Sequence, residues 1–261
     1  MCLECGCGQS KGFQVHSMDA EPSVAAPPAA GLGALAAETP GTAPSFTVEL
    51  GASLLAKNDR LAERNRGFFL GRGILAVNLV SSPGSGKTSL LERTLDEFGR
   101  EHSCAVVVGD LETDNDARRL HRTRVPVAQI TTGTACHLDA EMVARAAELV
   151  VKDGTRVLFI ENVGNLVCPA DFDLGETLRV VLLATTEGED KPLKYPPIFK
   201  SANVVLLTKP DVAGVLGFDC RQALDNIRRV APQALVLSLS SRSGEGLAEW
   251  YALLRQALPP L

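Results

Sequence analysis

The sequence shows no excess of positive charge, no long apolar run and no apolar stretch behind a basic start, and each absence makes one class of partner or compartment less expected. The net charge is −5 and the lysines and arginines form no stripe, so binding to nucleic acid or to an anionic membrane has little electrostatic support. No apolar run approaches the ~20 residues of a membrane-spanning helix, and no apolar stretch follows a basic start. We therefore expect a cytoplasmic protein with no nucleic-acid partner and no membrane partner.

The cysteines do not form an even set that could pair in disulfides. The chain has seven of them, an odd number, and three lie between Met1 and Cys7. A reducing cytosol keeps such residues as thiols. Metal ligation or simple burial therefore explains them better than disulfide bonding.

Composition divides the chain into a cysteine-rich start at 1–8, a linker at 9–45 and a folded domain at 46–261. The linker is rich in alanine, proline, glycine and threonine without helical or strand periodicity, which predicts a disordered N-terminal tail. From about Phe46 apolar residues return at helical spacing, which predicts a helix leading into the domain. With 45% apolar residues the domain can bury a sizeable core.

Short apolar stretches alternate with helical ones through this domain. The expected strands are the segments ILAVNLV, CAVVVG, VPVAQI, RVLFIEN, LRVVLLAT, NVVLLT and ALVLSLS. The expected helices are Thr88–Phe98, Thr113–Arg122, His137–Val151, Asp219–Val230 and Leu247–Gln256. This alternation is the signature of βαβ units. The predicted fold class is α/β, a doubly wound and mainly parallel sheet with helices on both faces and ligand loops at the carboxyl ends of its strands.

A phosphate-binding loop follows the first strand. The segment Ser81–Thr88 reads SSPGSGKT and runs directly into a helical stretch, which is the context that a P-loop NTPase requires. Its backbone amides and the positive end of the helix dipole would hold phosphates, with Lys87 on the β- and γ-phosphates and Thr88 on Mg²⁺. The nucleotide contacts are expected from Gly84, Ser85, Gly86, Lys87, Thr88 and Ser89. One departure is Ser81 at the first glycine position, and the alternative interpretation is an ordinary glycine-rich turn with an exposed lysine.

Two further segments favour a GTPase. Glu161 ends a strand three residues before Gly164, as expected where a carboxylate reaches Mg²⁺ through water and a glycine amide senses the γ-phosphate. The segment Thr208–Asp211 reads TKPD and resembles the guanine motif N-K-x-D, with threonine in place of asparagine. The Asp211 carboxylate would accept both N–H groups of guanine, which adenine cannot donate. Lys209 would lie over the base, and Ser241 and Arg242 would supply a base-contacting loop. A plain β-turn after the strand is the alternative.

Two sets of metal ligands are expected. Cys2, Cys5 and Cys7 place three thiols close together, joined by glycines, and suit a soft or borderline cation such as Ni²⁺, with Zn²⁺ possible. The alternative for these three cysteines is thiols without a role.

A second set comprises Cys136 and His137 at a helix start and Cys168 beyond Gly164. Three ligands leave a site incomplete, which suits metal exchange or sharing across a dimer. The alternative is that Cys136 fills the core and His137 donates a hydrogen bond at the helix start.

These motifs together resemble the HypB family, SIMIBI-class P-loop GTPases that help insert nickel into [NiFe]-hydrogenase. The resemblance covers 1–8 and about 51–258 and is carried by the segments MCLECGCG, LLAKNDRLAERNRGFF, NLVSSPGSGKTSLLERT, GDLETDNDARRL, TGTACHLDA, FIENVGNLVCPADFDLGE and TKPD. The linker lacks the histidine-rich run that some relatives use to store nickel, so storage is not expected.

The resemblance implies further roles and partners. Asp110 and Asp114 would be the switch carboxylates that meet Mg²⁺ or position water, and Glu161 would be the second acidic residue of the metal's water shell. The cysteines of the tail would form the tight nickel site, and Cys136, His137 and Cys168 a nucleotide-coupled site for nickel or zinc. The implied partners are a second copy in a GTP-dependent homodimer, a HypA-like nickel chaperone and the hydrogenase large-subunit precursor.

Two competing functions stay open on the sequence. A urease-type nickel GTPase would share the phosphate loop and the sheet, although the cysteine cluster at 1–8 is not expected of it. A metal-buffering protein that binds nickel without hydrolysis is the other. The intact Lys87–Thr88 pair and Glu161 favour an enzyme that converts GTP to GDP and phosphate.

Overall fold

The computed structural model describes residues 13–19 and 45–260. Their centre is an eight-stranded sheet with the order β1-β4-β3-β5-β2-β6-β7-β8, in which only β1 runs antiparallel to its neighbour. The strands are β1 (Gln14–Ser17), β2 (Leu75–Ser81), β3 (Cys104–Asp110), β4 (Val127–Thr131), β5 (Val157–Glu161), β6 (Leu178–Ala184), β7 (Val204–Thr208) and β8 (Leu235–Leu239).

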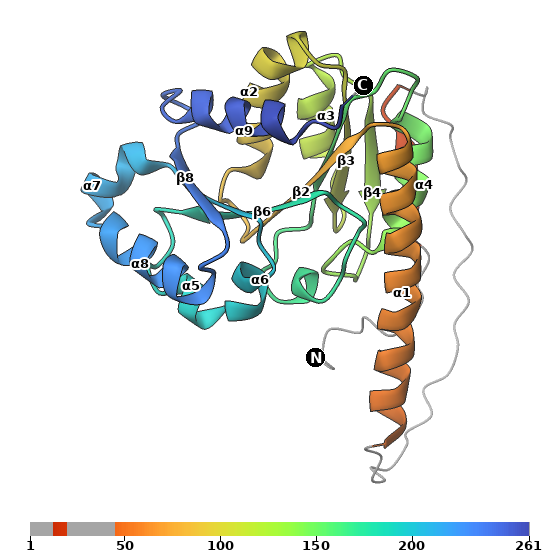
Figure 1. The fold of residues 1–261 in the computed structure, drawn as a ribbon, viewed down its shortest axis with the longest axis horizontal. Helices are drawn as coiled ribbons and strands as arrows, with labels where there is room; N and C mark the ends of the chain where they lie inside the picture. Colours follow the sequence, from red (N-terminus) through yellow and green to blue (C-terminus); the bar gives the residue numbers. More distant parts are fainter. Residues whose placement is uncertain (1–12, 20–44, 261) are drawn as a thin grey trace.

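Helices cover both faces of the sheet (Figure 1). They are α1 (Ser45–Gly71), α2 (Lys87–Glu97), α3 (Asn115–His121), α4 (Ala140–Val150), α5 (Lys191–Lys194), α6 (Pro196–Lys200), α7 (Ala213–Leu216), α8 (Cys220–Val230) and α9 (Leu247–Ala257). Helices α2, α3 and α9 pack on one face, while α1, α4, α6 and α8 pack on the other. This two-faced cover explains why the central strands are continuously apolar rather than alternating.

Successive residues of β2 show how the sheet divides the core. Leu75, Val77 and Leu79 join the cluster that includes Trp250 of α9. Ala76 joins the cluster under α1 and α4 on the opposite face. All of these side chains are fully buried. Because β2 is buried on both faces and lies between β5 and β6, the loop at its carboxyl end is held on a rigid support at the point where the strand order reverses.

The predicted fold class is confirmed, and all seven expected strands are present within one or two residues of their expected bounds. The linker prediction for 9–45 is wrong at β1, because residues 14–17 pair with β4 and Phe13 and Val15 pack against the core. The remainder of that segment, apart from the start of α1 at Ser45, lies outside the described residues. The short helices α5, α6 and α7 were not predicted from the sequence.

Helix α4 begins later than expected. It starts at Ala140, with the Asp139 carboxylate accepting a hydrogen bond from the Met142 amide at 2.8 Å. This is a regular N-terminal cap, so His137 precedes the helix and does not open it. Cys136 and His137 therefore lie in the loop between β4 and α4.

Helix α1 is anchored by two buried asparagines. Asn58 accepts a hydrogen bond from the Ala140 amide and donates one to the Asp173 carbonyl. Asn65 donates to the carbonyls of Ala140 and Leu174. The helix thereby joins the start of α4 to the segment before β6. Within residues 13–19 and 45–260, no helix combines the length and apolar content that crossing a membrane would need.

Candidate functional site: a phosphate loop beside a cysteine–histidine cluster

The phosphate loop lies between β2 and α2, as its sequence predicts. Gly84 and Gly86 adopt φ angles of 75° and 98°, a left-handed conformation that favours glycine. These turns bring the chain into α2 at Lys87. Backbone amides and the N-terminus of an eleven-residue helix therefore face one cleft, which is the arrangement that binds phosphate.

Lys87 is held inside the loop. It is 8% exposed and its Nζ donates a hydrogen bond to Ser81 Oγ at 3.1 Å. Burial lowers the pKa of Lys87, while the carboxylates of Glu161, Asp116, Glu187 and Asp110 act in the opposite direction. Ser81, which stands where the motif has glycine, thus provides an oxygen that holds the lysine in place.

Glu161 and Thr88 form the candidate magnesium site. Thr88 Oγ1 donates a hydrogen bond to Glu161 Oε1 at 2.7 Å. Burial raises the pKa of Glu161 to about 7, against the opposing effect of Lys87. Its second oxygen, Oε2, is buried with no hydrogen-bond partner among the described residues. A buried carboxylate oxygen without a donor, next to a threonine hydroxyl, fits a divalent cation of the Mg²⁺ type, because such a cation prefers oxygen ligands.

A cleft of about 520 Å³ opens over these groups. It is lined by the expected residues Gly84, Gly86, Lys87, Thr88, Ser89, Asp110 and Glu161. Asp110 accepts hydrogen bonds from the amides of Glu112 and Thr113 through Oδ1. Gly164 also lines the cleft, and a Cβ at that position would lie 3.1 Å from atoms of Pro83. The β5 loop and the phosphate loop therefore touch each other.

Of the predicted catalytic carboxylates Asp110, Asp114 and Glu161, only Asp114 is absent from the lining of this cleft. It stands at the start of α3 and pairs with Arg118 at 2.8 Å. Asp116 and Arg119 line the cleft instead, and Arg119 donates to Glu92 and to Ser89 Oγ. These two residues carry no motif of their own in the sequence. Only their positions on the first turns of α3, beyond Asp110, could have identified them.

The predicted base-binding residues line an adjoining pocket of about 240 Å³. It contains Ser85, Gly86, Ser89, Lys209, Asp211, Ser241 and Arg242. Lys209 has a φ angle of 61° and its Nζ donates to the Gly84 carbonyl at 2.7 Å. The exposed Asp211 follows in a short 3-10 turn. The structure thus brings the TKPD segment, the loop after β8 and the phosphate loop together around one pocket.

The second set of predicted metal ligands is also assembled. One ligand atom from each of Cys136, His137 and Cys168 lies within 4.8 Å of the others, and the two Sγ atoms are 2.7 Å apart. His137 is 6% exposed, and its Nδ1 is buried with no hydrogen-bond partner among the described residues. Burial lowers the pKa of His137, which favours the neutral imidazole that binds metal. Two thiols and an imidazole are a donor set suited to nickel or zinc.

Short contacts join this cluster to the nucleotide cleft. Asn165, one residue beyond Gly164, donates a hydrogen bond to the Cys136 carbonyl at 3.3 Å. Cys168 begins a 3-10 turn, Cys168–Ala170, a few residues farther along the same loop. A single loop therefore borders the phosphate cleft at one end and supplies a sulfur ligand at the other.

The remaining predictions on cysteine divide between the tail and the core. Cys2, Cys5 and Cys7 lie outside the described residues. Cys104 is buried in β3 and Cys220 packs beside the core at the start of α8, which is the simple burial that the sequence offered as the alternative to metal ligation.

Comparison with known proteins identifies the family of this chain. Residues 75–238 match the family model "CobW/HypB/UreG, nucleotide-binding domain". The hydrogenase maturation factor HypB of Azotobacter vinelandii is 50% identical over 88% of this chain and 78% of the relative. HypB of Escherichia coli K12 is 49% identical over 84% of this chain and 76% of the relative.

A solved structure of a HypB protein has a similar fold. The crystal structure of HypB from Helicobacter pylori in complex with nickel superimposes with a TM-score of 0.74 at 38% identity, covering 78% of this chain and 98% of that one. This chain matches these HypB proteins over most of their length. That favours the HypB family over a urease-type GTPase. Since the family model matches residues 75–238 and these relatives are 50% and 49% identical over 88% and 84% of this chain, the chain belongs to the HypB family of P-loop GTPases.

Proposed function

We propose that this protein hydrolyses GTP to GDP and phosphate in the cytoplasm and uses the reaction to deliver nickel during maturation of a [NiFe]-hydrogenase. The observation that carries the proposal is the position of Cys136, His137 and Cys168 on loops that adjoin the nucleotide cleft. The cytoplasm suits this role because a reducing compartment keeps the cysteine ligands as thiols.

In the proposed reaction, water attacks the γ-phosphorus and the bond to the β–γ bridging oxygen breaks, which releases GDP and phosphate. Lys87 pairs with the β- and γ-phosphates, where charge develops. Thr88 and Glu161 hold Mg²⁺, which neutralises charge on the same phosphates when it is bound. Asp110 and Asp114 are the proposed switch carboxylates, and Asp116 is a third candidate because it lines the cleft.

Guanine selection is assigned to the adjoining pocket. Asp211 accepts the two N–H groups of the guanine edge, and the Lys209 side chain lies over the base. Ser241 and Arg242 close the pocket from the loop after β8. Adenine cannot make the paired donation to Asp211, so its binding would leave a carboxylate unsatisfied.

Nickel is the proposed cargo at two sites, and zinc is the competing occupant of the second. The tail residues Cys2, Cys5 and Cys7 form the tighter site, and the domain cluster forms the site that responds to nucleotide. The structure of the Helicobacter pylori relative with nickel supports nickel as the metal. An incomplete set of three ligands suits handover, because an open position accepts a ligand from the next protein.

The proposed partners follow from the family and from this incomplete site. They are a second copy of the chain in a GTP-dependent homodimer, a HypA-like nickel chaperone and the hydrogenase large-subunit precursor. A two-fold dimer that joins the nucleotide-facing surfaces would let two copies share one metal.

The test combines phosphate release with nickel titration of the full chain. We expect Mg²⁺-dependent phosphate release that is faster with GTP than with ATP, together with nickel binding that is lost in stages when the tail cysteines and then Cys136 are replaced by serine. Nickel binding without phosphate release would identify a metal-buffering protein. Phosphate release without nickel binding would identify a GTPase with a different cargo.

A further inference from the structure

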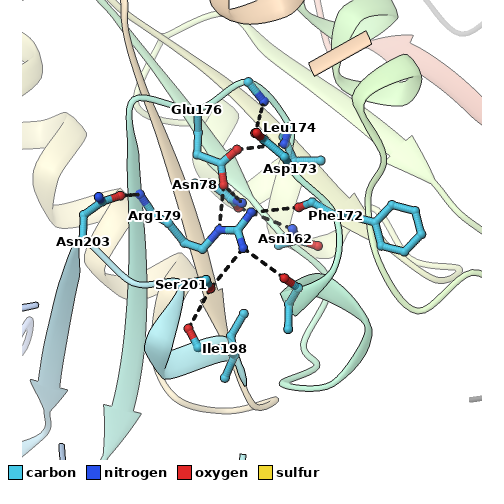
Figure 2. Close-up of polar contacts among 12 residues, drawn as sticks. Asn78, Asn162, Phe172, Asp173, Leu174, Glu176, Arg179, Ile198, Ser201 and Asn203 are labelled. Atoms are coloured by element: carbon cyan, nitrogen blue, oxygen red, sulfur yellow. Dashed lines mark hydrogen bonds and ion pairs between the residues drawn. The ribbon is translucent and has the colours of Figure 1, made fainter. Parts of the chain in front are cut away.

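Four polar side chains are buried around the segment between β5 and β6, and none of them is among the proposed metal ligands or phosphate-binding residues, although Asn162 lines the nucleotide cleft. They are Asn78, Asn162, Glu176 and Arg179, with exposures of 0%, 1%, 7% and 7%. Buried polar groups are costly unless each is hydrogen-bonded. Figure 2 shows that these side chains converge from β2, from the loop after β5, from the segment leading into β6 and from the start of β6 itself.

Arg179 holds the loop that carries Cys168. Its guanidinium donates to the Phe172 carbonyl at 2.8 Å, to the Ala170 carbonyl at 3.4 Å and to Ser201 Oγ at 3.1 Å. Ala170 ends the 3-10 turn that Cys168 begins. We call the segment 162–177 between β5 and β6, which carries Cys168, the metal loop. The guanidinium lies against this loop and holds its backbone at two carbonyls (Figure 2).

Glu176 balances the charge of Arg179 and ties the pair to the sheet. Its Oε1 accepts from Arg179 Nε at 2.7 Å and from Asn78 Nδ2 at 3.0 Å, while Oε2 accepts from the Leu174 amide at 2.8 Å. Asn78 lies in β2, three residues before Ser81 and the phosphate loop. The metal loop is thus attached to the strand that supports the phosphate loop.

Asn162 extends the network to the other ligands. Its side-chain amide donates to Asn78 Oδ1 at 3.4 Å, and its Oδ1 accepts from the amides of Leu138 and Val163. Leu138 directly follows His137, and Asn162 directly follows Glu161. The same network therefore reaches the histidine ligand and the carboxylate of the candidate magnesium site.

A ring contact completes the connection. The Phe172 ring stacks on the His137 imidazole with centroids 3.9 Å apart and planes 30° apart. Because Arg179 fixes the Phe172 carbonyl, it also fixes the residue against which the imidazole packs.

We propose that Arg179 is a positioning residue for the metal site, holding Cys168 through the Ala170–Phe172 backbone and orienting His137 through the Phe172 ring. The inference rests on the proposed role of Cys136, His137 and Cys168 as ligands. Groups that orient metal ligands without touching the metal typically change affinity 10–100-fold when replaced. A buried ion pair adds little net stability compared with an apolar replacement, so stability alone does not explain this pair.

The test uses the full chain with Cys2, Cys5 and Cys7 replaced by serine, so that only the domain site binds nickel. Two variants are compared in this background, Arg179→Lys and the double change Glu176→Gln with Arg179→Met. The lysine keeps a positive charge beside Glu176 but cannot reach both carbonyls. The double change removes both charges, so that no buried charge is left alone. Arg156→Lys is the matched control. Arg156 directly precedes β5 and donates to the Pro259 carbonyl, whereas the metal loop follows the other end of β5.

We expect nickel affinity in the GDP-bound state to fall about 10–100-fold in the double variant and by a smaller factor in Arg179→Lys. The nickel–thiolate absorption should shift in both variants, while nickel-free GTP hydrolysis stays close to that of the background protein. Arg156→Lys should change neither nickel affinity nor absorption. If the double variant does not fold, Arg179→Lys decides the question.

Nickel affinity and absorption equal to the background in the folded variants would overturn the positioning role. Failure of the proposed function is a separate result: the background protein would then bind no nickel, or would bind it equally well after Cys136→Ser. That result removes the metal site and the positioning role together, and it is recognised without any Arg179 variant.

Discussion

Thr208 donates its hydroxyl hydrogen to the Ser85 carbonyl at 2.8 Å, which joins the guanine motif at the end of β7 to the phosphate loop at the end of β2. Both residues are buried, with exposures of 4% and 1%. The threonine that replaces asparagine in the motif is therefore a structural link between the base pocket and the phosphate cleft. It stands in the wall of the base pocket and braces the loop that borders it.

Replacing Thr208 by valine should test this link. Valine keeps the shape but leaves the buried Ser85 carbonyl without its donor, which typically costs about 1–3 kcal/mol. We expect a lower free energy of unfolding in urea and weaker GTP binding. Thr208→Ser is the control because it retains the hydroxyl, and it should stay close to wild type. A loss in Thr208→Ser with none in Thr208→Val would show that the methyl group matters rather than the hydrogen bond.

Lys87→Ala should lower the kcat of GTP hydrolysis by at least ~100-fold, because charge that develops on the γ-phosphate needs a fixed cation. The measurement is phosphate release at saturating GTP and Mg²⁺. Lys152→Ala, which removes an exposed lysine beyond α4, should leave the rate unchanged. An unchanged rate in Lys87→Ala would remove the catalytic assignment.

Gly246 should tolerate alanine much less well than Gly244. Both have positive φ angles, 73° and 88°, but a Cβ on Gly246 would lie 2.0 Å from the Ser238 carbonyl oxygen, whereas one on Gly244 would meet only an arginine side chain at 3.6 Å. The left-handed conformation costs an alanine about 1–2 kcal/mol at either position. The steric clash should add about 1–3 kcal/mol at Gly246 alone. Urea unfolding of both variants measures the difference, and equal losses would contradict it.

Local pattern was sufficient to predict most of the sheet from the sequence. The strands β2 to β8 are apolar runs bounded by turns, and the burial of β2 to β7 on both faces makes that pattern strong. Strand β8 is only partly buried. Strand β1 is different, since it has four residues and depends on the open edge of β4, which local sequence does not reveal. Helix α4 starts at Ala140 rather than at His137 because the Asp139 side chain caps the helix there, accepting a hydrogen bond from the Met142 amide.

The site was predictable where chemistry repeats at fixed spacing and unpredictable where it depends on distant contacts. The phosphate loop and the TKPD segment carry such spacing. Asp116 and Arg119 reach the cleft only because α3 packs beside α2. The Glu176–Arg179 pair had one available signal, the polar Asn78 within an otherwise apolar strand, since a buried asparagine needs buried partners.

The tail cysteines should be separable from hydrolysis. Replacing Cys2, Cys5 and Cys7 by alanine should remove the tighter of the two nickel-binding sites and leave the GTPase rate intact. The described cleft is lined by residues from Pro83 onward. Nickel titration and phosphate release on the same sample check both parts. Loss of hydrolysis in the triple variant would mean that the tail contributes to the GTPase site.

Nickel affinity at the domain site should depend on the nucleotide. Cys168 lies four residues beyond Gly164, which lines the phosphate cleft and touches Pro83 of the phosphate loop. A γ-phosphate that draws Gly164 toward it must also move a loop that supplies a metal ligand. A ligand that moves between the GDP and GTP states gives two metal affinities, and linkage requires nickel to change GTP affinity by the same factor.

We therefore expect the protein without tail cysteines to bind nickel with different affinities in GDP and in a non-hydrolysable GTP analogue, by about 1–3 kcal/mol, a typical coupling. Cys168→Ala should reduce the difference, whereas Cys220→Ala, which changes a cysteine outside the cluster, should preserve it.

If two copies share the metal, GTP and nickel should each also promote association in sedimentation experiments, because each ligand stabilises the state that the other prefers. Superimposable nickel isotherms in the two nucleotide states would show that hydrolysis does not gate metal transfer at this site, since a ligand with equal affinity for both states shifts neither.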